Sequence, residues 1–255
     1  MSLLSVAMNI RGSLRSVLDI ATSAVMIVAA STLIYKNLWD GPRTAQAEPE
    51  LPNEPLSIDG ANIRGSDAAN VVMVMFSDFQ CPFCRRFARE VLPEIERRYV
   101  QTGRVALAFR HFPLPIHKQA RPAAVMAECA GHEGLFGQMH DLLFDQEDLD
   151  AETLLAIRKS LHLDGQSFEM CLLDQAVAAA VATSVDQAHA LRVRATPTFF
   201  LGRRDVNGRV TVSRAISGAK PVSDFVEQLD DVLAGKQGTR FSWRALLRLN
   251  WWNQS

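Results

Sequence analysis

Two cysteines separated by two residues are the part of this sequence best suited to chemistry. The motif Cys81-Pro82-Phe83-Cys84 is compatible with half of a zinc site, a structural disulfide or a redox centre. A structural zinc site needs four ligands, which usually come from two such pairs. The other two cysteines, Cys129 and Cys171, are isolated, and the six histidines do not occur at metal-ligand spacing. We therefore expect no metal at this motif, and we expect the histidines to be surface or capping groups.

The position of the motif favours the redox interpretation. It directly follows the apolar run Val71–Phe76, which reads as a strand buried on both faces. Apolar residues at helical spacing then occupy Pro82–Gln101, with Pro82 at the first helical position and a kink expected at Pro93. Free N–H groups and the positive end of the helix dipole favour an anion at Cys81. The sequence therefore predicts a reactive thiolate at Cys81 and, one helical turn later, a less exposed resolving thiol at Cys84.

The elements around the motif predict an α/β fold that is interrupted by helices. Val105–Phe109 alternates like a second strand, so the first half forms a βαβ unit. From residue 117 to 191 only amphipathic helical patterns occur, and strand patterns return at Thr198–Leu201 and Val210–Ile216. Asn207-Gly208 predicts the hairpin turn between these strands. The predicted helices are His117–Ala130, Gly134–Phe144, Ala151–Leu161 with Asp150 as its N-cap, Ser167–Leu173, Ala176–Leu191 and Pro221–Leu233.

Two segments together resemble a known family. FSDFQCPFCRRF after an apolar strand, with ATPTFF about 115 residues later, is similar to the DsbA-type branch of the thioredoxin superfamily. The resemblance implies a thioredoxin fold, a central mixed sheet flanked by helices, with an inserted helical subdomain. It also implies that Cys81 is the nucleophile, that Cys84 resolves, and that Pro197 is cis and faces them. Thr196 would then pair its backbone with a bound substrate strand.

The sequence departs from this family at two positions near the motif. Met75 stands where relatives often carry a buried acid that moves the proton of the resolving thiol. Asp78 is a partial substitute at best, and we expect it to be solvated. Phe83 stands where the best-known members have a histidine, and it cannot hydrogen-bond a thiolate. We therefore expect Cys81 to be less acidic than the strongest oxidants, whose pKa is about 3.5.

The remaining cysteines allow two interpretations. In an oxidising compartment Cys129 and Cys171 could join, and related proteins often have a second, non-catalytic disulfide at such sites. Closing a loop of that size adds about 4 kcal/mol in the chain-entropy model. The alternative is two separately buried free thiols.

The first residues predict a membrane anchor. Residues 20–39 are almost uncharged and approach the length that spans a bilayer, and arginines precede them. Residues 1–19 would then be cytoplasmic, 40–55 a linker, 56–235 the folded domain and 236–255 a basic, Trp-containing tail. A signal peptide cleaved after Ala45-Gln46-Ala47 and a buried core helix are the alternatives.

These features together predict an enzyme, a protein disulfide oxidoreductase that works outside the cytoplasm. It would be membrane-anchored and periplasmic in a Gram-negative cell, or secreted after signal cleavage. It would need no cofactor beyond the Cys81–Cys84 disulfide, would act on protein thiols or disulfides, and would be reset by a membrane redox partner. The alternatives are a reductase or isomerase of the same fold, and a binding or chaperone-like module without turnover. A nucleic-acid partner would favour a basic protein surface, and the formal net charge of −1 gives no indication of one.

Overall fold

The computed structural model of the chain describes residues 26, 31–32, 49–163 and 165–236. The chain divides into two compact units, Met1–Gln46 and Ala47–Ser255. The predicted membrane helix at 20–39 and the predicted cytoplasmic N-terminus at 1–19 lie outside the described residues, apart from isolated positions. The same is true of most of the predicted linker and of residues 237–255 of the tail.

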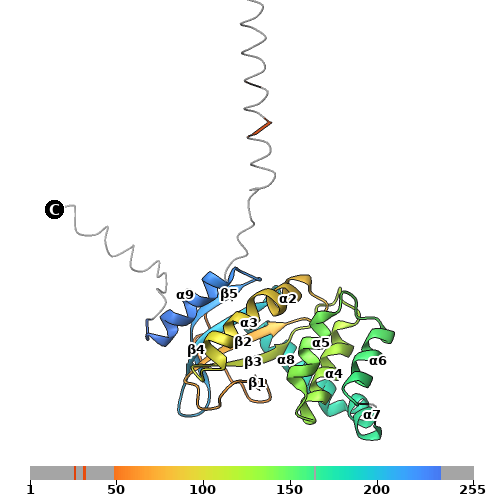
Figure 1. The fold of residues 1–255 in the computed structure, drawn as a ribbon. Coiled ribbons are helices and arrows are strands. Elements are labelled where there is room, and N and C mark those ends of the chain that lie inside the picture. The colour runs from red at the N-terminus through yellow and green to blue at the C-terminus, as the bar shows by residue number, and fades with distance from the viewer. Residues whose placement is uncertain (1–25, 27–30, 33–48, 164, 237–255) are drawn as a thin grey trace, which may run out of the picture. The chain divides into compact units, whose positions relative to one another are not determined.

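A five-stranded mixed sheet forms the centre of the second unit (Figure 1). Its strand order is β1-β3-β2-β4-β5, with β2 and β3 parallel and the other neighbours antiparallel. The strands are β1 (Asn62–Arg64), β2 (Val71–Ser77), β3 (Val105–His111), β4 (Thr198–Arg204) and β5 (Val210–Ser217). The expected strands are confirmed, and each runs one to three residues longer than the pattern indicates. The short edge strand β1 was not predicted, because three residues carry no readable alternation.

The helical stretch after the motif changes type along its length. It consists of α2 (Pro82–Arg86), the π-helix η1 (Phe87–Val91), α3 (Leu92–Ile95) and the π-helix η2 (Glu96–Val100). Pro93 has no N–H to donate to the preceding turn. The wider π turn of η1 ends two residues before Pro93, and such turns commonly accompany a break in the hydrogen-bond ladder. The interruption expected at Pro93 therefore takes the form of a change in helix type.

The predicted helical insertion separates β3 from β4 (Figure 1). Asp150 caps the third of its helices by accepting a hydrogen bond from the Thr153 N–H at 2.7 Å, as expected. The helices are α4 (Ala120–His132), α5 (Phe136–Asp145), α6 (Ala151–Ser160), α7 (Gln166–Leu173) and α8 (Gln175–Ala190). In the described ranges, no single helix is long and apolar enough to cross a membrane; the pair α7–α8, bent by 50°, meets the criteria of length and composition.

The hairpin of β4 and β5 contains the predicted turn. Gly208 adopts a φ of 77°, and the Asp205 carboxylate accepts the N–H of Asn207 at 2.8 Å. A bulge interrupts the register between Leu201 and Gly202. A side chain at position 202 would come within 2.2 Å of the Thr211 carbonyl, so this close approach requires glycine. The helix α9 (Val222–Leu233) follows β5.

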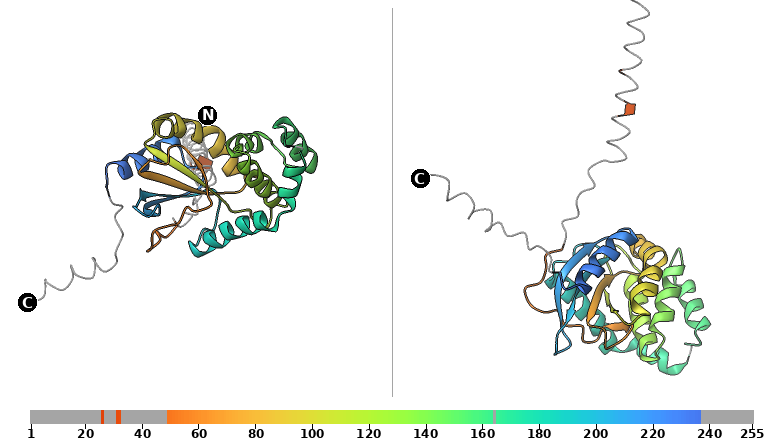
Figure 2. Two further views of the ribbon diagram at one scale, coloured as in Figure 1. Left: turned by 90° about the horizontal axis from the view of Figure 1, so that it is seen from below. Right: turned by 60° about the vertical axis from the view of Figure 1, so that its left-hand side comes forward.

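The alternation of buried residues along β2 produces two hydrophobic clusters, one on each face of the sheet. Val71, Met73 and Met75 face the helices α2 to η2, the insertion helices α4 and α5, and α9. Val72, Val74 and Phe76 face the opposite cluster, which includes the end of α8 and the segment around Leu56. Figure 2 shows α9 and the helix after the motif along the same side of the sheet. The motif therefore lies on the more heavily covered face.

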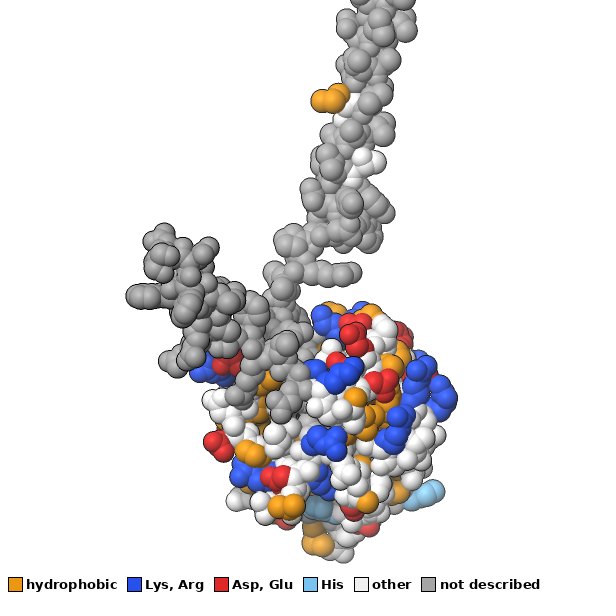
Figure 3. All heavy atoms as spheres, turned by 90° about the vertical axis from the view of Figure 1, so that its left-hand side faces the viewer, with side chains coloured by type: hydrophobic (Ala, Val, Ile, Leu, Met, Phe, Trp, Pro, Cys, Tyr) orange, Lys and Arg blue, Asp and Glu red, His pale blue; other side chains and the backbone are white. Residues whose placement is uncertain are grey.

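The surface of this unit mixes charges of both signs. In the view of Figure 3, Lys and Arg side chains alternate with Asp and Glu side chains, with apolar side chains between them. This agrees with the small net charge of the chain.

Candidate active site

Cys81 and Cys84 lie where the sequence predicts, at the junction of β2 and α2. Cys81 is the N-cap residue of α2, and Pro82 occupies the first turn. The Cys81 N–H donates to the Asp78 carbonyl at 3.1 Å, and the Cys81 carbonyl accepts the Arg85 N–H at 3.0 Å. Both thiols are free and buried, with 4% and 1% of their surfaces exposed. Phe83 between them is 52% exposed. The two sulfurs are therefore shielded from solvent, whereas the aromatic side chain between them in the sequence is half exposed.

The loop before β4 brings a second part of the sequence onto the first cysteine. The Thr196–Pro197 peptide bond is cis, as the resemblance implies. The Cys81 thiol donates a hydrogen bond to the Thr196 backbone carbonyl at 3.3 Å, across 115 residues of sequence. The Thr196 hydroxyl is buried and has no oxygen or nitrogen partner in the described part of the chain. The predicted substrate-binding residues and the predicted nucleophile therefore form one site.

The pKa values of the two thiols are shifted in opposite directions. The hydrogen bond from Cys84 lowers the pKa of Cys81 to about 6, assisted by the Thr196 hydroxyl and by backbone N–H groups of α2, although burial raises it. Burial raises the pKa of Cys84 well above its ordinary value, and the adjacent Cys81 raises it further. Cys81 is therefore less acidic than the strongest oxidants, as expected from Phe83, but far more acidic than a free thiol. A thiol with a lowered pKa is more often a thiolate and leaves more readily, so this asymmetry is consistent with the predicted role of Cys81.

The expectation that Asp78 is solvated is wrong. Its side chain is fully buried and accepts three hydrogen bonds, from the N–H groups of Gln80 and Leu114 at 2.7 Å and from His117 Nδ1 at 2.8 Å. Gln80 in turn accepts the Gln119 N–H at 2.5 Å. The carboxylate thus ties the loop before Cys81 to the loop between β3 and α4. A buried acid is tolerated there because every donor around it points at its oxygens.

The expectation that the histidines are surface or capping groups is wrong for two of them. His111 and His140 are only 4% and 1% exposed. His140 packs among aromatic rings, including Phe79, whose ring centroid lies 6.0 Å away, and burial lowers its pKa. His111 Nε2 lies 2.8 Å from Glu128 Oε1. Sequence spacing does not reveal these contacts, because the partners come from different elements.

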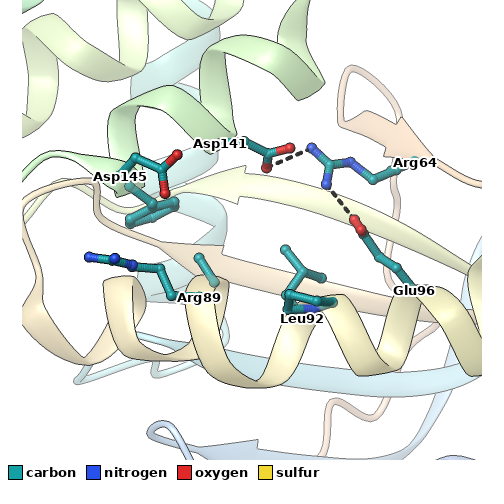
Figure 4. Close-up of a pocket in the computed structure, with 9 residues that line it drawn as sticks. Arg64, Arg89, Leu92, Glu96, Asp141 and Asp145 are labelled. Carbon is teal, nitrogen blue, oxygen red and sulfur yellow. Dashed lines mark hydrogen bonds and ion pairs between the residues drawn. The ribbon is translucent and has the colours of Figure 1, made fainter.

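A charged cluster joins the helix after the motif to the insertion. Arg64 of β1 forms ion pairs with Glu96 of η2 and with Asp141 of α5, the latter at 3.1 Å (Figure 4). Arg89 and Asp145 line the same pocket, with about 260 Å³ of space. The pocket contains neither cysteine of the motif, so we assign the cluster a structural role.

The second cysteine pair forms a disulfide within the insertion. Cys129 of α4 and Cys171 of α7 are joined, with 5.8 Å between their Cα atoms and 42 residues of sequence separation. No group of three or more His, Cys, Asp or Glu side chains in the described ranges could hold a metal ion.

The fold and this site define a class of protein. A CxxC pair at a helix N-terminus, a facing cis-proline loop and a helical insertion within a five-stranded mixed sheet are the features of a DsbA-like thioredoxin-fold protein. The family model described as thioredoxin matches residues 58–217, more than half of the chain. The chain belongs to the thioredoxin family.

Comparisons with curated proteins give two kinds of relative. The chain is 35% identical over 167 residues to the Na(+)/H(+) antiporter NhaA 3 of Salinispora tropica, covering 65% of this chain and 25% of that protein. It therefore spans about a quarter of the length of the first curated relatives it matches. It is 28% identical over 196 residues to a putative protein-disulfide oxidoreductase of Rickettsia prowazekii, covering 73% of this chain and 69% of the relative.

Solved structures share the fold. α-DsbA1 of Wolbachia pipientis superposes with a TM-score of 0.63 at 23% identity, covering 76% of this chain and 96% of that chain. BdbD from Bacillus subtilis gives a TM-score of 0.60 at 24% identity, covering 73% and 100%. At these identities the likeness establishes the fold alone.

Proposed function

We propose that the chain is a protein thiol–disulfide oxidoreductase that acts on extracytoplasmic proteins, with net oxidation favoured. The observation that carries this proposal is the contact of Cys81 with the cis-proline loop, together with the lowered pKa of that thiol. The relative from Rickettsia prowazekii, named a putative protein-disulfide oxidoreductase, supports the same class of activity.

The exchange follows from the acidities of the two thiols. A substrate thiolate attacks Cys81 Sγ in the oxidised protein, the Cys81–Cys84 bond breaks, and Cys84 leaves and takes up a proton. A second thiolate of the substrate then attacks the substrate sulfur that is bonded to Cys81 in the mixed disulfide. This forms the substrate disulfide and displaces Cys81, which leaves as a stable thiolate. The substrate loses two electrons and two protons, and the protein gains the two electrons. The backbone of Thr196 lies beside Cys81, where an extended substrate segment can pair with it.

The activity is tested with a reduced, unfolded substrate such as ribonuclease. We expect the oxidised protein to introduce disulfides stoichiometrically, and the variant Cys81→Ser to introduce none. A membrane protein that accepts the two electrons would make the reaction catalytic, and the Cys81–Cys84 pair needs no other cofactor. Faster reduction of substrate disulfides than oxidation of thiols would favour the reductase or isomerase alternative. Binding without exchange would mean a chaperone-like module and would contradict the proposal.

We also propose that residues 20–39 anchor the protein with its catalytic domain outside the cytoplasm. An arginine at the centre of a membrane helix costs about 2.5–3.5 kcal/mol in insertion. Val28→Arg should therefore release the full chain from membranes on alkaline carbonate extraction, whereas Val28→Leu should not. Equal extraction of both variants would rule out a spanning anchor.

A further inference from the structure

The resolving thiol is closed off from solvent and still has to exchange a proton. Cys84 is 1% exposed, and its pKa lies well above the ordinary value, so it is a protonated thiol in the reduced protein. In every exchange cycle it must lose or gain a proton. Met75, where relatives often carry an acid, has no ionisable group, and Asp78 already accepts three hydrogen bonds. Another group must carry this proton.

The end of β2 supplies the first such group. The Ser77 hydroxyl lies close enough to Cys84 to lower the pKa of its thiol, and the Asp78 backbone N–H acts in the same direction, although burial raises that pKa more strongly. The Ser77 hydroxyl is buried and has no oxygen or nitrogen partner in the described residues. A hydroxyl can accept one proton and donate another in the same step. Ser77 is therefore placed to pass a proton to or from the Cys84 sulfur.

The neighbouring strand supplies the second group. Ser77 and His111 are register partners on the parallel strands β2 and β3. Along β2 the residues Met73 and Met75, and along β3 Leu107 and Phe109, face the same cluster that contains Cys84. Because side chains alternate along a strand, Ser77 and His111 continue these two rows and lie side by side on that face.

The environment of His111 suits a proton acceptor. Burial raises the pKa of Glu128, but the hydrogen bond and charge of His111, the hydrogen bond from Asn62 and the charge of His132 together outweigh burial. The net pKa is lowered, so Glu128 is a carboxylate. It accepts the Nε2–H of His111 at 2.8 Å and a hydrogen bond from Asn62 at 3.1 Å. A neutral His111 bound in this way presents Nδ1 as an acceptor. If it gains a proton, the adjacent carboxylate stabilises the imidazolium.

Within the part of the chain that the structure describes, Glu128 is the charged group that pairs with His111. Phe79 from the loop after β2 and Phe136 from α5 present aromatic rings at 5.9 and 6.2 Å between centroids. Glu128 on α4 is its ion-pair partner, and the charges of His132 and Arg110 act on Glu128. Glu128 keeps 15% of its side chain exposed, so the chain of groups ends near solvent.

We propose that Ser77 and His111 form a proton relay between the Cys84 thiol and the carboxylate of Glu128. This inference rests on the proposed exchange function. During resolution, Cys84 S–H gives its proton to Ser77 Oγ, and Ser77 O–H gives its proton to His111 Nδ1. The Cys84 sulfur then attacks Cys81 Sγ in the mixed disulfide, the bond from Cys81 to the substrate sulfur breaks, and the substrate leaves as a thiolate. In the oxidising direction the relay runs in reverse and protonates Cys84 as it leaves.

The relay is tested with the reduced full chain and an aromatic disulfide that releases a coloured thiolate. Attack by Cys81 releases one equivalent in a first phase, and resolution by Cys84 releases the second equivalent in a later phase. Ser77→Ala should slow the second phase at neutral pH by at least about tenfold, since positioned proton transfer typically contributes about 10²–10⁴-fold. The first phase should stay within about twofold. The difference in second-phase rate between the wild-type protein and Ser77→Ala should become smaller as the pH rises, because hydroxide then removes the Cys84 proton directly.

Matched variants separate the relay from a structural effect. Ser184→Ala on α8 removes another buried hydroxyl without a partner and should leave both phases unchanged. Ser77→Thr keeps a hydroxyl and should restore most of the rate. His111→Asn should slow the second phase, and the double variant Ser77→Ala/His111→Asn should be no slower than the slower single variant, because both act on one path.

Results that contradict the relay differ from results that contradict the proposed exchange activity. The relay is overturned if the second phase of Ser77→Ala equals that of Ser184→Ala, if Ser77→Thr is as slow as Ser77→Ala, or if the losses of the single variants multiply in the double variant. A wild-type chain that releases neither equivalent would overturn the exchange function instead. Thermal unfolding of each variant checks that the fold is intact.

Discussion

At the scale of single residues, Thr196 acts on the Cys81 sulfur through two different groups, its backbone carbonyl and its hydroxyl. The thiol form of Cys81 donates to the Thr196 carbonyl at 3.3 Å, whereas a thiolate cannot donate and instead attracts the Thr196 hydroxyl. The carbonyl therefore holds the sulfur in place when it is protonated, and the hydroxyl stabilises it when it is charged.

Thr196→Val keeps the shape of the side chain and removes only the hydroxyl. We expect the pKa of Cys81 to rise and its alkylation at about pH 6 to slow by up to about tenfold, since a hydrogen bond to a charged group is worth about 1.5–3 kcal/mol. Stopped-flow alkylation across pH measures this. Thr198→Val, at the first residue of β4, is the matched control, because its hydroxyl donates to the Ala195 carbonyl and not to the thiol. An unchanged titration in Thr196→Val would mean that the hydroxyl does not contact the thiolate.

Asp78 acts on the site through the backbone that it holds. Asp78→Ala leaves two partly buried N–H groups and one partly buried imidazole without their acceptor. Each unsatisfied buried group costs about 1–3 kcal/mol, so the free energy of unfolding should fall by about 3 kcal/mol or more. Chemical denaturation measures this loss. Asp145→Ala removes an exposed carboxylate and should change stability by less than about 0.5 kcal/mol. Equal stability of the two variants would contradict the proposed role of Asp78 in linking the loop before Cys81 to the loop between β3 and α4.

At the scale of elements, the sequence predicts helices, strands and turns within one segment, but it does not predict contacts between segments that lie far apart in the chain. The strands, the insertion helices and the turn at Asn207-Gly208 follow from periodicity and capping, because these signals lie within one segment. The edge strand β1 and the buried positions of Asp78 and His111 depend on partners far along the chain. The sequence shows that Met75 replaces an acid, but it does not show which groups could take over the proton transfer. The proposed pair, Ser77 and His111, is identified only from the register of β2 and β3.

The disulfide between α4 and α7 is an element-scale constraint that is separate from the reactive pair. It closes 42 residues, for which the chain-entropy model gives about 4 kcal/mol of stabilisation. The double variant Cys129→Ala/Cys171→Ala should lose about that much stability in urea denaturation. Its rate of disulfide exchange should remain unchanged, because Cys81 and Cys84 lie on the thioredoxin part of the fold. An unchanged midpoint of unfolding, or loss of exchange in a folded variant, would contradict this assignment.

At the scale of the whole molecule, the acidity of Cys81 sets the direction of electron flow. A stabilised thiolate favours the reduced protein, which makes the disulfide more oxidising. With a pKa of about 6 for Cys81, we expect a reduction potential between those quoted for thioredoxin and the strongest DsbA-type oxidants, about −270 and −120 mV. Equilibration with glutathione buffers measures it. A value at or below that of thioredoxin would favour the reductase alternative over net oxidation.

The most direct test of the central claim is the pH dependence of Cys81 alkylation in the reduced protein. Cys84 is buried and holds its proton, so the reaction reports on Cys81 alone. We predict a rate that rises with a midpoint near pH 6, and a higher midpoint in Cys84→Ala, where the hydrogen bond that most lowers the pKa of Cys81 is removed. A midpoint near that of an ordinary thiol, about 8.5, in both proteins would contradict the account.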